Sequence, residues 1–166
     1  MRAAARHPVV SAGADLNHVS VSAPDLEASL RFYVDVLGLE PIPTPNFGFP
    51  VQWLRAGDGQ LHLFNRSVAA PAYHHFGVTV DDLPAVYERA IAHGCLDEDT
   101  FSGSLVELPG DTIQLYLRDP AGNLLEVNAL GVDRLPDAMR RRLVRLADVH
   151  PQSEENLRGR LPLADG

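Results

Sequence analysis

The sequence predicts an α+β protein made of two repeated β-α-β-β-β modules and a C-terminal helix. Two repeats support this. The stretch LNHVSVSAPDL (16–26) recurs as HFGVTVDDL (75–83), and LRAGDGQLHLFN (54–65) recurs as LRDPAGNLLEVN (117–128). One such module leaves a sheet face and an edge uncovered, so two must associate to bury a core. We expect a single domain over 15–131, with modules at 15–66 and 73–131, a flexible tail at 1–14 and a helix with a tail at 132–166.

The first module alternates a short strand with a helix and a hairpin. Residues 15–22 alternate apolar with polar side chains, as in a strand with one buried face. Helical spacing follows over 25–36, with an apolar stripe that includes Val34, and Gly38 is a typical C-terminal stop. The Pro-rich segment 40–50 predicts an edge strand or loop. Residues 51–55 and 61–65 flank the turn AGDG and predict a hairpin.

The second module repeats this order. We expect a strand at 75–80, a helix whose stripe runs from Leu83 to Ile91 before Gly94, and strands around Leu105, at 113–117 and at 124–128. A further helix is predicted from Pro136 to Asp148, and it carries four arginines at positions 140, 141, 142 and 145. We expect it to pack on the domain with its arginines in solvent, and the alternatives are a subunit contact or a contact to an anionic substrate.

Composition excludes several classes of protein. The 166 residues are 45% hydrophobic and carry a net charge of −8, which argues against nucleic-acid binding. No apolar run approaches the roughly 20 residues of a membrane-spanning helix. The basic N-terminus lacks the apolar core of a secretory signal, and the single Cys95 has no internal disulfide partner. We therefore expect a cytoplasmic protein.

Histidine and glutamate at repeated positions predict a metal site. His18 and His75 begin equivalent strands, seven residues before Asp25 and Asp82. Glu126 lies in the otherwise apolar strand LLEVN, where an unpaired buried carboxylate is costly. Two imidazoles and a carboxylate suit a first-row divalent metal and leave open positions. If the halves close on each other, we expect these three side chains to converge.

His62 is the fourth candidate ligand. An ungapped repeat pairs His62 with Leu125 and turns it away from the cleft, whereas a shift by one residue aligns it with Glu126 and turns it inward. The other histidines, at positions 7, 74, 93 and 150, are expected to stay outside the site, because they lie beyond the repeated strands or on the opposite face of one.

The segments LNHVSVSAPDLEASLRFYVDVLGLE, LHLF, HHFGVTVDDL and DPAGNLLEV together resemble the vicinal oxygen chelate (VOC) superfamily over about 16–130. The superfamily includes glyoxalase I, methylmalonyl-CoA epimerase, fosfomycin-resistance proteins, extradiol dioxygenases and bleomycin-binding proteins. The resemblance implies a glyoxalase/bleomycin-resistance-type cleft and one divalent metal per chain (Fe, Mn, Zn, Ni or Co). It implies the ligands His18, His62, His75 and Glu126, with Glu126 also catalytic.

The resemblance leaves the reaction open. Glyoxalase I usually has a carboxylate where His62 stands, and the bases of the epimerase are not assignable here. We expect a metal-dependent lyase or isomerase/epimerase acting on a small molecule, as a homodimer. The alternatives are an extradiol-type dioxygenase, a fosfomycin-type thiol transferase, or a metal-free protein that sequesters a bleomycin-type drug.

Seven further residues are candidates for substrate binding. They are Ser20, Phe47, Phe49, Trp53, Arg55, Tyr116 and Arg118. Ser20 shares the face of His18, and the aromatic residues would wall an apolar substrate or, equally, pack under the Pro-rich loop. Arg55 and Arg118 hold equivalent repeat places, where they flank turns or bind a substrate carboxylate.

Overall fold

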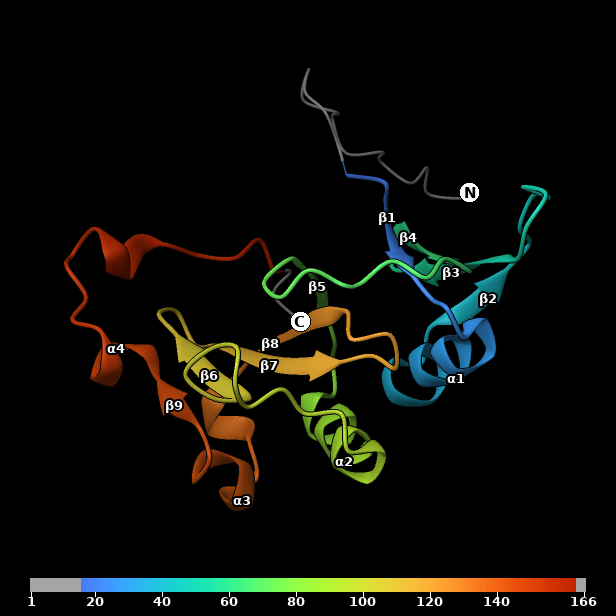
Figure 1. The fold of residues 1–166 in the computed structure, drawn as a ribbon. Helices are drawn as coiled ribbons and strands as arrows, with labels where there is room; N and C mark the ends of the chain where they lie inside the picture. Colours follow the sequence, from blue (N-terminus) through green and yellow to red (C-terminus); the bar gives the residue numbers. More distant parts are fainter. Residues whose placement is uncertain (1–15, 164–166) are drawn as a thin grey trace, which may run out of the picture.

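The computed structural model describes residues 16–163 and shows two β-α-β-β-β modules (Figure 1). The predicted tail at 1–14 lies outside the described residues. Module one consists of β1 (His18–Ser22), α1 (Leu26–Leu37), β2 (Glu40–Ile42), β3 (Val51–Ala56) and β4 (Gly59–Phe64). Its sheet has the order β1-β4-β3-β2, in which β1 and β4 are parallel. The α+β fold and the edge position of the Pro-rich strand are confirmed.

Module two repeats the arrangement and adds a strand. It consists of β5 (His75–Thr79), α2 (Leu83–His93), β6 (Leu105–Leu108), β7 (Thr112–Arg118) and β8 (Leu124–Leu130). The short β9 (Val144–Arg145) joins β6, so the sheet has the order β5-β8-β7-β6-β9. Strands β5 and β8 are parallel, as are β1 and β4 in module one.

Helix boundaries follow the capping residues that the sequence offers. Asp25 accepts a hydrogen bond from the backbone N–H of Ala28 at 2.9 Å, and Asp82 accepts one from Ala85 at 3.0 Å. Gly38 and Gly94 end the helices in the left-handed conformation, with φ of 70° and 62°. Capping is local chemistry, and it places both helices where the sequence predicts them.

The predicted helix faces were slightly wrong. Val34 and Ile91, expected in the apolar stripes, are 36% and 50% exposed, whereas Phe32 and Val36 are buried. The buried face of α1 is therefore rotated from the predicted one. The rotation arises because α1 packs against both its own sheet and α2.

The two modules are fastened through their helices and the β7–β8 turn. The hydroxyl of the fully buried Tyr33, on α1, donates to Oδ2 of Asp119, in the turn, at 2.8 Å. Arg89 on α2 donates through Nε to the carbonyl of Val36 at 2.9 Å. The amide of Asn123 donates to the carbonyl of Ser22 at 2.9 Å. These bonds join distant parts of the chain across one shared hydrophobic core.

The first strands of the modules remain unpaired on one side. Within residues 16–163, β1 pairs with β4 and β5 pairs with β8, and the two sheets share no hydrogen-bonded strands. A cavity of about 680 Å³ lies between these edges and is lined by residues of both, including Val19 of β1 and Phe76 and Val78 of β5. The first strands of the two modules therefore line one cavity between them.

The predicted C-terminal helix is also corrected. Residues 136–148 form α3 (Asp137–Arg140), then β9, and then α4 (Leu146–Val149). Helix formation stops because Val144 pairs with Val106 and completes the edge of β6, where Arg145 also forms an ion pair with Glu107. Open strand edges attract such pairing.

A last short helical turn, η2 (Asn156–Arg158), follows α4, and η1 (Val132–Arg134) precedes α3. Among the described residues, every helix is too short or too polar to cross a bilayer.

Candidate metal centre

His18 and His62 form one half of the candidate site. In the parallel pair β1–β4, His18 lies opposite Gln60 and Ser20 lies opposite His62, so both histidines project from the same face of the sheet. Their rings stack with centroids 4.5 Å apart and planes 17° apart. On the other side of His62, the indole of Trp53 stacks at 4.2 Å and 7°. His18 is exposed, whereas His62 is buried.

His75 and Glu126 form the other half. The Nε2 atom of His75 lies 3.5 Å from Oε2 of Glu126, whose side chain is buried. The same carboxylate accepts a hydrogen bond from the hydroxyl of Tyr116 at 3.1 Å and one from the amide of Asn128 at 3.0 Å. Burial, the charge of Glu126 and this hydrogen bond raise the pKa of Tyr116, so the phenol stays protonated and remains a donor.

Strand register shows that the two halves are equivalent. His18 lies opposite Gln60 of β4, and His75 lies opposite Leu124 of β8. His62 follows Gln60 by two residues and Glu126 follows Leu124 by two residues, so both hold the same place in their sheets. Strand pairing therefore confirms the alignment, shifted by one residue, that matches His62 with Glu126. By the same register, Trp53 opposite His62 is the counterpart of Tyr116 opposite Glu126.

The structure does not gather the predicted ligands into one cluster. Across residues 16–163, no three histidine, cysteine or acidic side chains lie close enough together to hold a metal ion. Convergence on one ion within a single chain is not seen in this structure, and the ligand set of His18, His75 and Glu126 stays a prediction. The four side chains form two pairs, and each pair sits on a different sheet. His18 and His75 both line the cavity between β1 and β5.

In His18, His62 and His75, one ring nitrogen lies beside an acceptor oxygen, and the other ring nitrogen takes no part in that hydrogen bond. Nδ1 of His75 lies 2.9 Å from the carbonyl oxygen of Tyr73, Nδ1 of His18 contacts the amide oxygen of Asn17, and Nε2 of His62 lies 2.8 Å from the amide oxygen of Gln60. An oxygen of this kind only accepts, so the bonded nitrogen carries the proton and the other nitrogen is a potential ligand. Burial and the adjacent His18 lower the pKa of His62, which favours the neutral ring.

Gly77 leaves room for the carboxylate. It lies opposite Glu126, and a Cβ atom added at Gly77 would approach Nδ2 of Asn128 to 3.2 Å and Oε1 of Glu126 to 3.6 Å. Alternation along the strand puts Asn128 on the face of Glu126, so the segment LLEVN carried the signal that would have identified this asparagine. Asn128 is not among the site residues predicted from the sequence.

Both candidate arginines have internal partners. Arg55 forms an exposed ion pair with Glu40 at 3.2 Å. Arg118 donates through Nε to the buried Asp97 at 2.7 Å, and its terminal nitrogens donate to the carbonyls of Gly122 and Ala72 and to the hydroxyl of Thr100. Arg118 therefore joins three loops. Its role as a carboxylate-binding residue stays a prediction without support from these contacts.

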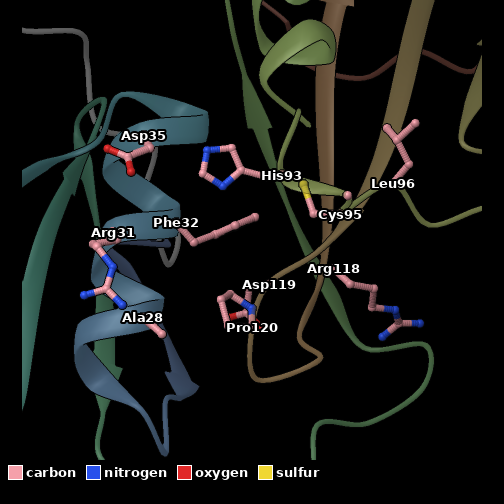
Figure 2. Close-up of a pocket in the computed structure, with 11 residues that line it drawn as sticks. Ala28, Arg31, Phe32, Asp35, His93, Cys95, Leu96, Arg118, Asp119 and Pro120 are labelled. Atoms are coloured by element: carbon pink, nitrogen blue, oxygen red, sulfur yellow. The ribbon is translucent and has the colours of Figure 1, made fainter. Parts of the chain in front are cut away.

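A separate cavity lies between α1 and the β7–β8 turn (Figure 2). It has a volume of about 480 Å³, and its lining includes Arg31, Asp35, His93 and Cys95. None of the four predicted metal ligands lines it. This cavity marks the junction of the modules rather than the candidate metal centre.

Comparisons with known proteins agree with this fold. The family model of the Glyoxalase/Bleomycin resistance protein/Dioxygenase superfamily matches residues 15–127. Methylmalonyl-CoA epimerase of Bos taurus is 34% identical over 83 residues, which is 41% of this chain and 47% of the epimerase, so the match spans about half of that relative. Lactoylglutathione lyase of Haemophilus influenzae is 30% identical over 66% of this chain and 87% of the lyase.

A solved structure shows the same architecture. The crystal structure of lactoylglutathione lyase from Agrobacterium tumefaciens superposes with a TM-score of 0.53 at 26% identity and covers 70% of this chain and 93% of that one. Fold and family model together define a protein built on paired β-α-β-β-β modules. The chain belongs to the Glyoxalase/Bleomycin resistance protein/Dioxygenase superfamily. This is the VOC superfamily that its sequence segments resemble.

Proposed function

We propose that this protein is a metal-dependent lyase or isomerase/epimerase that acts on a small molecule with adjacent oxygen atoms. We further propose that it works as a homodimer, in which His18 and His62 of one chain and His75 and Glu126 of the partner subunit bind one divalent ion. The observation that carries the proposal is the pairing of ligand-type side chains on two equivalent strand positions of two separate sheets.

The edge strands β1 and β5, each unpaired on one side, support assembly with a second copy. Each begins with a candidate ligand, and each borders the cavity between the modules. Exposed strand edges are surfaces on which another chain can pair. A twofold assembly uses the same surface on both subunits, so two half-sites on each chain would complete two full sites.

The donor set fits a first-row divalent ion. Three imidazoles with one proton-free nitrogen each and one carboxylate are typical ligands of such metals. A bound ion would supply positive charge that stabilises an oxygen anion developing on the substrate. The relatives named as a lactoylglutathione lyase and an epimerase carry out reactions of the class proposed here.

Glu126 is the proposed proton acceptor. A proton passes from the carbon beside one substrate oxygen to this carboxylate and from the same carboxyl group to the neighbouring oxygen-bearing carbon, so the isomerisation consumes no other reactant. Tyr116 and Asn128 hold one oxygen of Glu126 each and fix its orientation. The buried position excludes water from the carboxylate.

The first experiment is elemental analysis of protein purified without chelator or nickel affinity. We expect about one metal per chain, and its loss in His75→Ala and Glu126→Gln. His74→Ala is a matched control, because His74 adjoins His75 and contributes no contact to the pair. A protein without metal, or with equal metal in His75→Ala and His74→Ala, would contradict the proposal.

The second experiment asks whether two chains share each site. His18→Ala and Glu126→Gln are each expected to lose metal. When the two variants are mixed and reassembled, half of the dimers are mixed and each holds one intact site, so roughly a quarter of the wild-type metal should return. A site contained in one chain would recover nothing on mixing.

The metal-loaded protein is then assayed with methylglyoxal–thiol adducts, acyl-CoA thioesters, fosfomycin and catechols to separate lyase or epimerase from transferase and dioxygenase activity.

A further inference from the structure

Aromatic rings extend from His62 over one side of module one. The indole of Trp53 stacks on His62, and the ring of Phe47 lies 5.9 Å from that indole and 6.1 Å from the ring of Phe64. Phe49 completes the group at 5.9 Å from Phe64. We call these four residues, Phe47, Phe49, Trp53 and Phe64, the aromatic wall. Ring separations of this size are the favourable range for aromatic pairs.

Two features indicate that the aromatic wall contacts a ligand. Phe47, on the loop between β2 and β3, is 43% exposed although it is large and apolar. The indole N–H of Trp53 is buried and has no hydrogen-bond partner among residues 16–163. Buried donors are normally satisfied. An oxygen-bearing molecule that enters beside Phe47 would both cover an exposed ring and supply the missing acceptor.

Module two frames its half-site with rings as well. Tyr116 is the strand counterpart of Trp53, and the ring of Phe101 lies 4.4 Å from it and 5.8 Å from the ring of His75. Phe101 is 38% exposed, and Tyr73, which lies 6.4 Å from Phe101, is 67% exposed. In the proposed two-chain site, both sets of rings would border the same ligand.

Two of the three arginines near the half-sites have acidic partners. Arg55 and Arg118 have acidic partners, and the guanidinium of Arg66 lies over the ring of Phe49 at 3.7 Å, at the margin of the aromatic wall. A glutathione adduct or a CoA thioester carries several anionic groups that call for cationic partners. Apart from Arg66 at the margin, the side chains described around the half-sites offer mainly aromatic surface.

We infer that the protein binds a small planar aromatic or conjugated molecule with adjacent oxygen atoms, whose ring packs against the aromatic wall while its oxygens face the histidine pair. This inference rests on the proposed function for the position of the oxygens. The contact of the ring with the wall does not require a metal.

The chain has a single tryptophan, so fluorescence of Trp53 reports directly on the wall. Catechol is titrated under anaerobic conditions into the metal-free protein and into the protein as purified, and cis-1,2-cyclohexanediol serves as the matched ligand, with the same oxygens and no π system. We expect catechol to quench Trp53 and to bind at least about tenfold more tightly than the diol. Equal affinity of the two molecules would overturn the inference.

Substitutions localise the binding. Phe47→Ala should weaken catechol binding about five- to tenfold without loss of fold, because the side chain is exposed on a loop. Leu157→Ala, which removes a 46%-exposed apolar side chain in the C-terminal segment, should leave affinity unchanged. An unchanged affinity in Phe47→Ala would refute the aromatic wall as the binding surface.

The outcomes separate the two proposals. Selective catechol binding by a protein that never contains metal supports the aromatic wall and refutes the metal-dependent function. Metal that is lost in His75→Ala, together with equal binding of catechol and the diol, keeps the function and refutes the inference.

Discussion

Replacing Tyr33 by phenylalanine should weaken the junction between the two modules. The hydroxyl of Tyr33 donates to the buried carboxylate of Asp119 at 2.8 Å, and the tyrosine is fully buried. Hydrogen bonds to charged groups contribute about 1.5–3 kcal/mol. Asp119 keeps a second donor on the same oxygen, the amide of Asn123 at 2.7 Å, so we expect the lower part of that range. Tyr33→Phe should lower the free energy of unfolding by about 1.5–2 kcal/mol and the Tm by about 3–8 °C.

The same change should alter the response to alkaline pH. Burial, the charge of Asp119 and the hydrogen bond raise the pKa of Tyr33 well above its ordinary value of 10.0. The folded protein therefore keeps this proton while the unfolded chain releases it. The contribution is fully present below pH 10 and is lost as the pH rises above it, with a slope of up to about 1.4 kcal/mol per pH unit. The chain contains no lysine, whose titration would overlap.

Urea unfolding at pH 8, 10 and 11 measures both effects. Tyr73→Phe is the control, because Tyr73 is 67% exposed and its loss of a hydroxyl should change stability by less than about 0.5 kcal/mol. Tyr116 also has a raised pKa, so some alkaline slope should remain in Tyr33→Phe. Equal stability of Tyr33→Phe and wild type at pH 8, with the same alkaline slope, would refute the reasoning.

Three further predictions concern the site and the loops around it. Gly77→Ala should keep the fold but reduce metal content, because the new methyl group presses on the amide of Asn128, which donates to Glu126 and orients it, whereas Ser20→Ala at the equivalent place in β1 should not; elemental analysis and circular dichroism check this. Arg118→Ala should lower the free energy of unfolding by about 2–3 kcal/mol, since its partner is buried, whereas Arg55→Ala should cost less than about 1 kcal/mol, as urea titration would show. Burial alone would raise the pKa of Asp97, but hydrogen bonds from Thr100 and Arg118 lower it overall, so this carboxylate stabilises the fold above about pH 4 and loses that effect as the pH falls. Acid unfolding of Arg118→Ala should consequently begin at a higher pH than that of wild type, and coincident acid transitions would contradict this role of Asp97.

Local signals in the sequence predicted the elements well. Asp25 and Gly38 delimit one helix and Asp82 and Gly94 delimit the other, because caps act through bonds to backbone only a few residues away. The C-terminal segment was different. Its helical pattern is real, but Val144 gains ladder bonds on β6 that the pattern cannot show.

The sequence predicted candidate ligands but not how these residues are distributed over the two sheets. The sequence identified His18, His62, His75 and Glu126 from the repeat, and strand register confirms that His62 and Glu126 hold equivalent places. The ion pair between Arg118 and Asp97 could not be predicted from the sequence, because the two residues are 21 positions apart and meet through loop packing.

By itself the sequence determined the two modules, their helix ends and the ligand-type side chains, since periodicity, capping and internal repetition depend on neighbours along the chain. The tertiary structure alone decided that those side chains form two pairs, His18 with His62 and His75 with Glu126, on sheets whose first strands border an open cavity. The distance between modules depends on how α1, α2 and the β7–β8 turn pack together, and that packing joins residues far apart in the sequence.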